Sequence, residues 1–284
     1  MKMARLRRLA PLSLLAVPLV VVPLLVSTSH AAPAQTGATV PSVTPAAAKH
    51  VLFGTSMGTD MAATIKMFPN SRIGRVFENQ LSAKLPALPS TWQIWLSFNN
   101  DPATVASGAF NAQFAAILQG WNASGRVVYW DWQHEADNPR SHLNPTQIRA
   151  GWAQLLSVEK KYPNAKVKSM SIYEGYMLHP SKPHGDPSIW YVDADVLGFD
   201  CYQPKAVVRA MEYAKSKGKP WSIPEFGSHA GDAGDIAYIS STITSWAAYP
   251  PIGAAWFNNT AAANYSQPLS QVPQTLAYLR ALAG

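Results

Sequence analysis

Short apolar runs alternate with segments of helical periodicity along most of the chain. The runs are hydrophobic at nearly every position, which is typical of strands that are buried on both faces of a parallel sheet. Eight runs are predicted as strands: Val51–Gly54, Ile73–Phe77, Trp92–Leu96, Val127–Trp132, Lys166–Ile172, Val196–Cys201, Trp221–Ile223 and Ile252–Trp256. Five segments are predicted as helices: Phe110–Trp121, Pro145–Lys161, Ala206–Lys217, Ile236–Trp246 and Gln274–Leu282.

The order of these segments indicates an α/β protein. The later strand ends follow one another at about 30 residues, the length of one βα unit in a barrel, so we predict a single-domain (β/α)8 TIM barrel. An open, doubly wound sheet is the alternative. It would normally carry a glycine-rich phosphate turn after an early strand, and Phe53 to Gly58 lacks the required spacing and the acidic residue that should follow.

The first 32 residues differ from the rest of the chain. Four basic side chains precede an apolar run at positions 9–26, and small residues then continue to Ala32. This pattern predicts a secretory signal peptide over residues 1–32 and a secreted protein, with the Arg7-Arg8 pair also permitting the twin-arginine route. Three prolines interrupt the apolar run, which argues against a membrane anchor, so we expect no stable membrane insertion after cleavage. Residues 33–49 are predicted as a flexible linker and residues 50–284 as the barrel.

Charge and cysteine content narrow the functional classes. The formal net charge is +7, but without the four basic residues of the signal segment 19 basic face 16 acidic residues, which leaves +3. No basic run with interleaved aromatic residues is present, so nucleic acid is not an expected partner. Cys201 is the only cysteine and lies in an apolar run, which excludes an intramolecular disulfide and predicts a buried thiol.

Two glutamates follow predicted strands at matching places. Glu135 ends the fourth strand region and Glu225 ends the seventh, 90 residues later. That distance is three βα units, so both carboxyl groups are expected at the C-terminal rim, where barrel enzymes keep their chemistry. Such a pair can split a glycosidic bond, because one carboxyl donates a proton to the leaving oxygen and the other attacks the anomeric carbon or activates water.

The sequences around these glutamates carry a family resemblance. Trp132-Gln133-His134-Glu135 and Ile223-Pro224-Glu225-Phe226-Gly227, with Gly253-Ala254-Ala255-Trp256-Phe257 on strand eight, resemble the clan of retaining (β/α)8 glycoside hydrolases with catalytic glutamates on strands 4 and 7. His134 stands where most of that clan has Asn, which is similar to glycoside hydrolase family 26, the mannanase-like branch. Ala136 and Asp137 depart from the residues usual there.

The resemblance implies roles for individual residues. Glu135 would be the acid/base and Glu225 the nucleophile of a secreted enzyme that cleaves β-linked polysaccharide, β-mannan included, by retaining double displacement. His134, Tyr202, Trp256, Arg75 and Glu174 would contact the substrate. We expect a monomer that needs no cofactor and whose partner is a polysaccharide or oligosaccharide.

Physical arguments add detail to these roles. Glu135 needs a raised pKa, which apolar walls such as Trp130 and Trp132 or a nearby carboxylate could provide. Glu225 must stay ionised, helped by Tyr202 and Arg75 as hydrogen-bond donors. Trp256 would offer an indole face to a sugar ring.

Other readings remain open or are disfavoured. A non-catalytic carbohydrate-binding barrel and a cell-wall or exopolysaccharide hydrolase of the same clan both fit the pattern. Asp131 and Asp200 lie within strands and are expected as hydrogen-bonded residues inside the barrel, while Glu174 is the rival carboxylate. The histidines show no His-Glu-x-x-His spacing, so no metal site is expected. A Gly-x-Ser-x-Gly motif for a serine hydrolase is missing.

Overall fold

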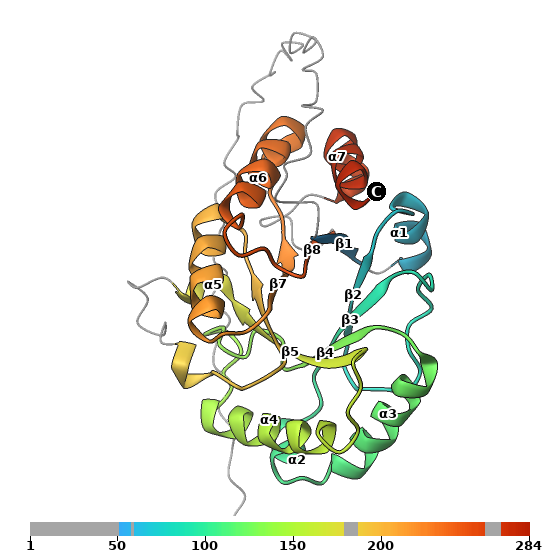
Figure 1. Cartoon of the computed structure of the whole chain (residues 1–284), viewed down its shortest axis with the longest axis vertical. Helices are drawn as coiled ribbons and strands as arrows, with labels where there is room; N and C mark the ends of the chain where they lie inside the picture. The colour runs from blue at the N-terminus through green and yellow to red at the C-terminus, as the bar shows by residue number, and fades with distance from the viewer. Residues whose placement is uncertain (1–50, 58–59, 179–186, 259–267) are drawn as a thin grey trace, which may run out of the picture. The chain divides into compact units, whose positions relative to one another are not determined.

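The computed structural model describes residues 51–284 apart from 58–59, 179–186 and 259–267. Eight parallel strands form a closed barrel in the order β1 to β8, with the helices around the outside (Figure 1). The predicted (β/α)8 barrel is therefore confirmed. The signal peptide and linker predicted for residues 1–49 lie outside the described residues. Over the described part of the chain, no helix is long and apolar enough to cross a membrane.

All eight predicted strands are present. They are β1 Leu52–Ser56, β2 Ile73–Glu78, β3 Gln93–Phe98, β4 Val128–Trp132, β5 Val167–Glu174, β6 Val196–Asp200, β7 Trp221–Phe226 and β8 Gly253–Trp256. The helices are α1 Met61–Met67, α2 Pro102–Ala106, α3 Asn111–Ser124, α4 Pro145–Glu159, α5 Pro204–Ser216, α6 Gly231–Ser245 and α7 Pro273–Ala283. The five predicted helices are confirmed as α3 to α7, with their ends moved by a few residues.

The short helices α1 and α2 are missing from the prediction because each is too short to show a helical period. Their starts carry a local signal all the same. The carboxylate of Asp60 accepts a hydrogen bond from the backbone N–H of Ala63 at 2.8 Å, and Asp101 does the same for Thr104 at 2.8 Å. Aspartate is a favoured residue at this capping position.

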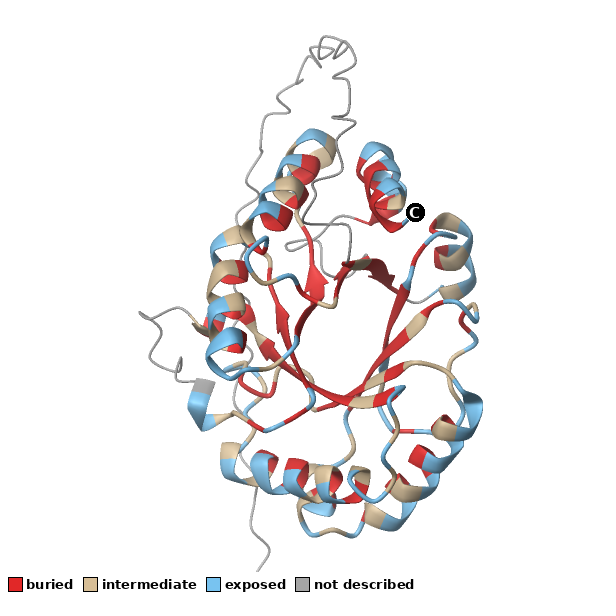
Figure 2. Cartoon of the chain, in the orientation of Figure 1, coloured by how far each residue is buried: buried red, intermediate tan, exposed pale blue. Residues whose placement is uncertain are grey.

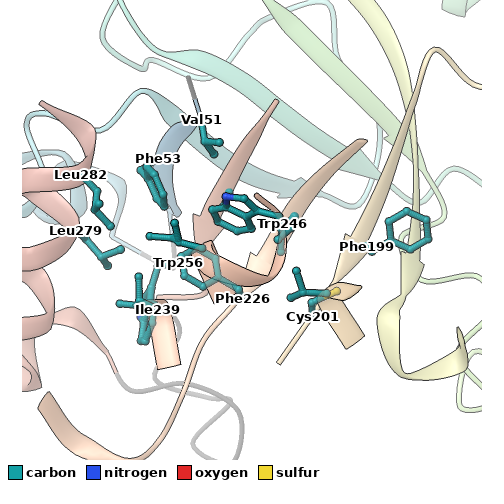
Figure 3. Packing of buried hydrophobic residues seen from close by; sticks show 14 of the residues in the cluster. Val51, Phe53, Phe199, Cys201, Phe226, Ile239, Trp246, Trp256, Leu279 and Leu282 are labelled. Atoms are coloured by element: carbon teal, nitrogen blue, oxygen red, sulfur yellow. The ribbon is translucent and has the colours of Figure 1, made fainter. Parts of the chain in front are cut away.

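Outward-facing strand residues pack beneath the helices and form the larger part of the core. Buried positions run along the strands and along the inner faces of the helices, while the outer helix faces are exposed (Figure 2). Phe53, Phe226 and Trp256 meet Ile239 and Leu279 in one such cluster (Figure 3). The thiol of Cys201 is buried in the same cluster, as predicted.

Inward-facing residues fill the barrel itself. An apolar layer contains six buried residues: Ile73, Trp95, Met170, Ile172, Val196 and Ala255. Successive strand residues alternate between the two faces. On β2 the inward series therefore runs from Ile73 through Arg75 to Phe77, and on β8 it runs from Gly253 through Ala255 toward Phe257. The C-terminal ends of these series lie above the apolar layer and build the rim.

Strand β7 breaks the alternation at Pro224-Glu225. Ile223 pairs with Ala254 and Phe226 pairs with Trp256, so three residue steps on β7 face two on β8. This is a β-bulge, and proline is tolerated there because a bulge frees one residue from the hydrogen-bonded ladder. Ile223 and Phe226 both pack outward, which allows Glu225 between them to turn into the barrel.

Candidate active site

Glu135 lies in a tight turn directly after β4. The backbone φ angles are 61° at Gln133 and 49° at Glu135, a left-handed conformation that costs a non-glycine residue roughly 1–2 kcal/mol. The turn is held by the backbone: the N–H of Glu135 donates to the carbonyl of Ile172 at 3.2 Å. Neighbouring structure therefore fixes this carboxyl group at the rim. Strained backbone of this kind is concentrated at functional sites.

Glu225 has close polar partners from two other strand ends. The hydroxyl of Tyr202, just after β6, donates to its Oε2 at 2.6 Å. His134 Nε2 lies 3.2 Å from its Oε1. Glu225 is only 4 % exposed, so its charge depends on these two partners.

A hydrogen-bonded chain leads from His134 back into the barrel. Nη2 of Arg75 lies 3.0 Å from His134 Nδ1 and donates to Ser97 Oγ at 2.7 Å, and Ser97 donates to Asp131 Oδ2 at 2.6 Å. Arginine can only donate, so Nδ1 of His134 is the acceptor and the ring proton sits on Nε2, facing Glu225. Asp131 is thus a hydrogen-bonded residue inside the barrel, as predicted.

The pKa of His134 is subject to opposing influences. Burial lowers the pKa, Glu225 raises it, and the net change is upward. A second ring proton on Nδ1 would nevertheless place two donors, the imidazole and Arg75, face to face. The hydrogen-bond geometry therefore belongs to the neutral ring.

Asp200 is a third acid within the site. Its Oδ2 lies 3.2 Å from His134 Nε2, and its side chain is 0 % exposed. Burial, followed by the charges of Glu225 and Glu135, raises the pKa of Asp200 well above its usual value. Asp200 lies inside the barrel, as expected, because it belongs to the inward series of β6 through Val196 and Gly198.

The environments of Glu135 and Glu225 shift their pKa values in opposite directions. Burial, and after it the charge of Glu225, raises the pKa of Glu135. Burial also acts to raise the pKa of Glu225, but His134, Arg75 and Tyr202 outweigh it, so the pKa of Glu225 lies below its usual value. Shifts in opposite directions favour Glu135 as the proton donor of the pair and Glu225 as the ionised carboxylate.

The structure brings five of the seven predicted site residues together: Glu135, Glu225, His134, Tyr202 and Arg75. Glu174 lies at the end of β5 in register with Asp200, where its backbone N–H donates to Asp137 Oδ1 at 3.0 Å. It is thus at the same rim.

Two predicted substrate contacts need correction. Trp256 is 0 % exposed and packs among Phe226, Phe53 and the helices, because its position on β8 faces outward. Arg75 is also 0 % exposed, so it acts on His134 rather than on a substrate. The prediction that Trp130 helps to form an apolar wall around Glu135 is wrong as well, because Trp130 stacks on Trp152 of α4 with 5.1 Å between ring centroids.

Two aromatic residues at the rim were missed. Phe77 ends the inward series of β2 and is 45 % exposed. Phe257, next to Trp256, packs edge-on against Tyr202 with 6.2 Å between ring centroids. The alternation of each strand carried the signal for both residues.

The same side chains could in principle meet a cation. Ligand atoms of His134, Asp200 and Glu225 lie within 4.8 Å of one another, the one such group in the described part of the chain. One imidazole and two carboxylates form a plausible donor set for a divalent metal. The guanidinium of Arg75 beside His134 opposes a second positive charge, however, so the geometry suits a hydrogen-bonded acid and base better.

Comparison with known proteins finds similarity to glycoside hydrolases in part of the sequence and in the fold. No protein-family model matches the chain. Two β-1,3-xylanases, from Vibrio sp and Alcaligenes sp, are 24 % and 25 % identical over 153 and 155 residues, which is 51 % and 52 % of this chain. The chain spans 33 % of the length of each of these relatives.

Solved structures share the fold at low identity. A GH5-4 broad-specificity endoglucanase from Clostridium longisporum has a TM-score of 0.54 at 11 % identity, covering 83 % of this chain and 97 % of its own. A GH26 β-mannanase from Bacteroides ovatus has a TM-score of 0.53 at 14 % identity, covering 82 % and 89 %. The barrel is therefore similar in fold to the glycoside hydrolases of families 26 and 5, in agreement with the resemblance of its strand-end motifs.

Proposed function

We propose that the protein is a glycoside hydrolase that cleaves β-linked polysaccharide with retention of configuration. The observation that carries this proposal is the pair Glu135 and Glu225 at the ends of β4 and β7, with pKa values shifted apart. The similarity in sequence to β-1,3-xylanases and in fold to a β-mannanase supports the substrate class. β-1,3-Xylan and β-1,4-mannan are accordingly the first substrates to test.

In the first step Glu225 attacks the anomeric carbon while Glu135 gives its proton to the glycosidic oxygen. The bond between carbon and that oxygen breaks, the shortened chain leaves as an alcohol, and the sugar is held as an ester on Glu225. The hydrogen bonds from Tyr202 and His134 keep Glu225 ionised before attack. The partly buried position of Glu135 raises its pKa, which favours its role as the proton donor.

In the second step Glu135, now a carboxylate, removes a proton from water. The water oxygen attacks the anomeric carbon, the ester bond breaks, and Glu225 leaves as a carboxylate. Two inversions give net retention. Asp200 lies 3.2 Å from His134 Nε2, and the charges of Glu225 and Glu135 help to raise its pKa, which favours its neutral form beside the ionised Glu225.

The test is a polysaccharide panel with product analysis for the wild type, Glu225→Gln and Glu135→Gln. We expect Glu135→Gln to slow cleavage by about 10²- to 10⁴-fold, with much of the first step recovered on an aryl glycoside whose leaving group needs no proton. Glu225→Gln should be inactive on both substrates. Glu212→Gln on the exposed face of α5 removes the same charge and should retain full activity. Hydrolysis that survives Glu225→Gln would refute the assignment.

Retention itself is read from the product. Proton NMR of the first-formed reducing sugar should show the β anomer before mutarotation. An α anomer would mean inversion, with Glu225 activating water instead of attacking.

We also propose that the protein is exported and that residues 1–32 are removed. The basic start, the apolar run and the small residues before Pro33 support this. Mass spectrometry of the protein from the culture medium should give an N-terminus near Pro33. A cell-bound product that retains Met1 would contradict export.

A further inference from the structure

A cavity of about 650 Å³ lies between the C-terminal ends of β1, β2 and β8. Ser56, Phe77, Glu78 and Phe257 are among the residues that line it. Phe257 also contacts Tyr202, the donor to Glu225, and Phe77 contacts His134, so two residues of the cavity wall touch residues of the proposed reaction centre. Its volume is in the range of small-ligand sites, about 300–1,000 Å³.

Phe77 gives this cavity an aromatic wall held in a fixed position. The guanidinium carbon of Arg75 lies 4.2 Å from the ring centroid, and the ring of His134 meets it edge-on at 5.3 Å. A ring supported in this way loses little conformational freedom when a ligand stacks on it. Phe77 nevertheless remains 45 % exposed, and an exposed aromatic ring at a rim is a surface available for binding.

Polar side chains follow directly on the same strand end. Glu78, Asn79 and Gln80 line the cavity next to Phe77. Glu78 is half-buried, and this burial raises the pKa of its carboxyl group. A carboxylate accepts hydrogen bonds, and amide side chains both donate and accept. An apolar face beside such groups matches a pyranose, which has a C–H face and a rim of hydroxyls.

We propose that this cavity binds the sugar unit adjacent to the one that reacts with Glu225, with Phe77 stacking on the ring and Glu78 accepting hydrogen bonds from its hydroxyls. The inference rests on the proposed function and extends it, because it names a second binding position and the residues that determine its specificity. Phe77 then has the stacking role that the sequence suggested for Trp256. Its short distance from His134 places the second sugar next to the cleaved bond.

The test uses binding to a variant that cannot turn over. Glu225→Gln is titrated calorimetrically with β-1,4-mannotetraose, β-1,3-xylotetraose and cellotetraose, and with the matching disaccharides. Adding Phe77→Ala should weaken tetrasaccharide binding roughly tenfold, whereas Phe77→Trp should retain it. Glu78→Gln should weaken binding more for some of the three sugars than for others.

Ile189→Ala is the matched control, because Ile189 is 44 % exposed and lies outside the cavity lining. It should leave binding unchanged, and thermal unfolding should show that Phe77→Ala folds like the wild type. Tetrasaccharide affinity that is equal in the Phe77→Ala and Ile189→Ala backgrounds overturns the inference, as does the failure of all these sugars to bind. If the wild type hydrolyses a glycan while Phe77→Ala changes nothing, the second site is wrong and the proposed function stands. Binding that depends on Phe77 without hydrolysis supports the site and refutes the proposed function.

Discussion

Glu159 offers a test of the electrostatics of the fold, away from the catalytic rim. It ends helix α4, and its Oε1 accepts a hydrogen bond from the indole N–H of the fully buried Trp130 at 2.8 Å. Burial, and after it the charge of Asp195, raises its pKa to about 7. Replacement by Gln keeps the acceptor for Trp130 and removes the charge. We therefore expect Glu159→Gln to stabilise the protein at neutral and alkaline pH.

The sign and size follow from linkage. Between pH 4.5 and 7 the folded state holds a proton on Glu159 that the unfolded state has released, so stability falls as the pH rises through this window. The raised pKa of about 7 exceeds the ordinary 4.5 by about 2.5 units, which at about 1.36 kcal/mol per unit sets an upper bound of about 3 kcal/mol above pH 7. Below pH 4.5 this contribution vanishes. For a domain of this size, about 3 kcal/mol raises Tm by roughly 6–12 °C.

The assay is urea unfolding followed by tryptophan fluorescence at pH 4, 6 and 8. The difference in unfolding free energy between Glu159→Gln and the wild type should be near zero at pH 4 and grow to its full value by pH 8. Glu212→Gln on the exposed face of α5 controls for the change in net charge and should show no such growth. A constant difference at all three pH values, or destabilisation at pH 8, would refute the reasoning.

Three further predictions concern the site and its support. Tyr202→Phe removes a charge-assisted hydrogen bond worth about 1.5–3 kcal/mol, so kcat/KM should fall roughly tenfold to a hundredfold. The pKa of Glu225 should also rise, and the acid limb of the pH–rate profile should move to higher pH. An acid limb that stays in place would contradict this role of Tyr202. Trp256→Ala should cost about 3–5 kcal/mol of stability and leave KM unchanged in the folded enzyme, because Trp256 packs in the core. A raised KM at unchanged Tm would instead mean that Trp256 contacts the substrate. Gly198→Ala would place a Cβ atom 2.8 Å from Pro224 Cγ. This overpacking should cost about 1–3 kcal/mol of stability, which an unfolding measurement would show. It should also shift the bulge and so lower kcat in steady-state kinetics.

The strands were predictable because parallel strands buried on both faces are apolar throughout, and nothing else in the chain competes with that pattern. The rim aromatics required one more step. Alternation along β8 turns Trp256 outward and Phe257 inward, and alternation along β2 brings Phe77 over the pit. A strand-end motif records which residues are present but not which face each occupies.

Glu225 is a case in which alternation alone would have misled. Trp221 and Ile223 face outward, so a regular strand would also turn Glu225 outward. Pro224 is the local signal for the exception, since proline in a central strand argues for a bulge. The distances among Glu225, His134 and Asp200 could not be predicted in the same way, because they depend on how three separate strand ends close around one another.

The difference between the two glutamates comes from their neighbours rather than from their positions. Both lie at the C-terminal rim, Glu225 buried and Glu135 partly buried. Glu225 receives two close donors, and through His134 it is linked to the buried charge of Arg75. Glu135 receives a weaker hydrogen bond from Asn138 at 3.3 Å and faces the charge of Glu225. A histidine before the acid/base, where most of the clan has Asn, thus connects the reaction centre to the barrel interior, because its ring accepts from Arg75 at Nδ1 and presents Nε2 to Glu225 on the opposite side.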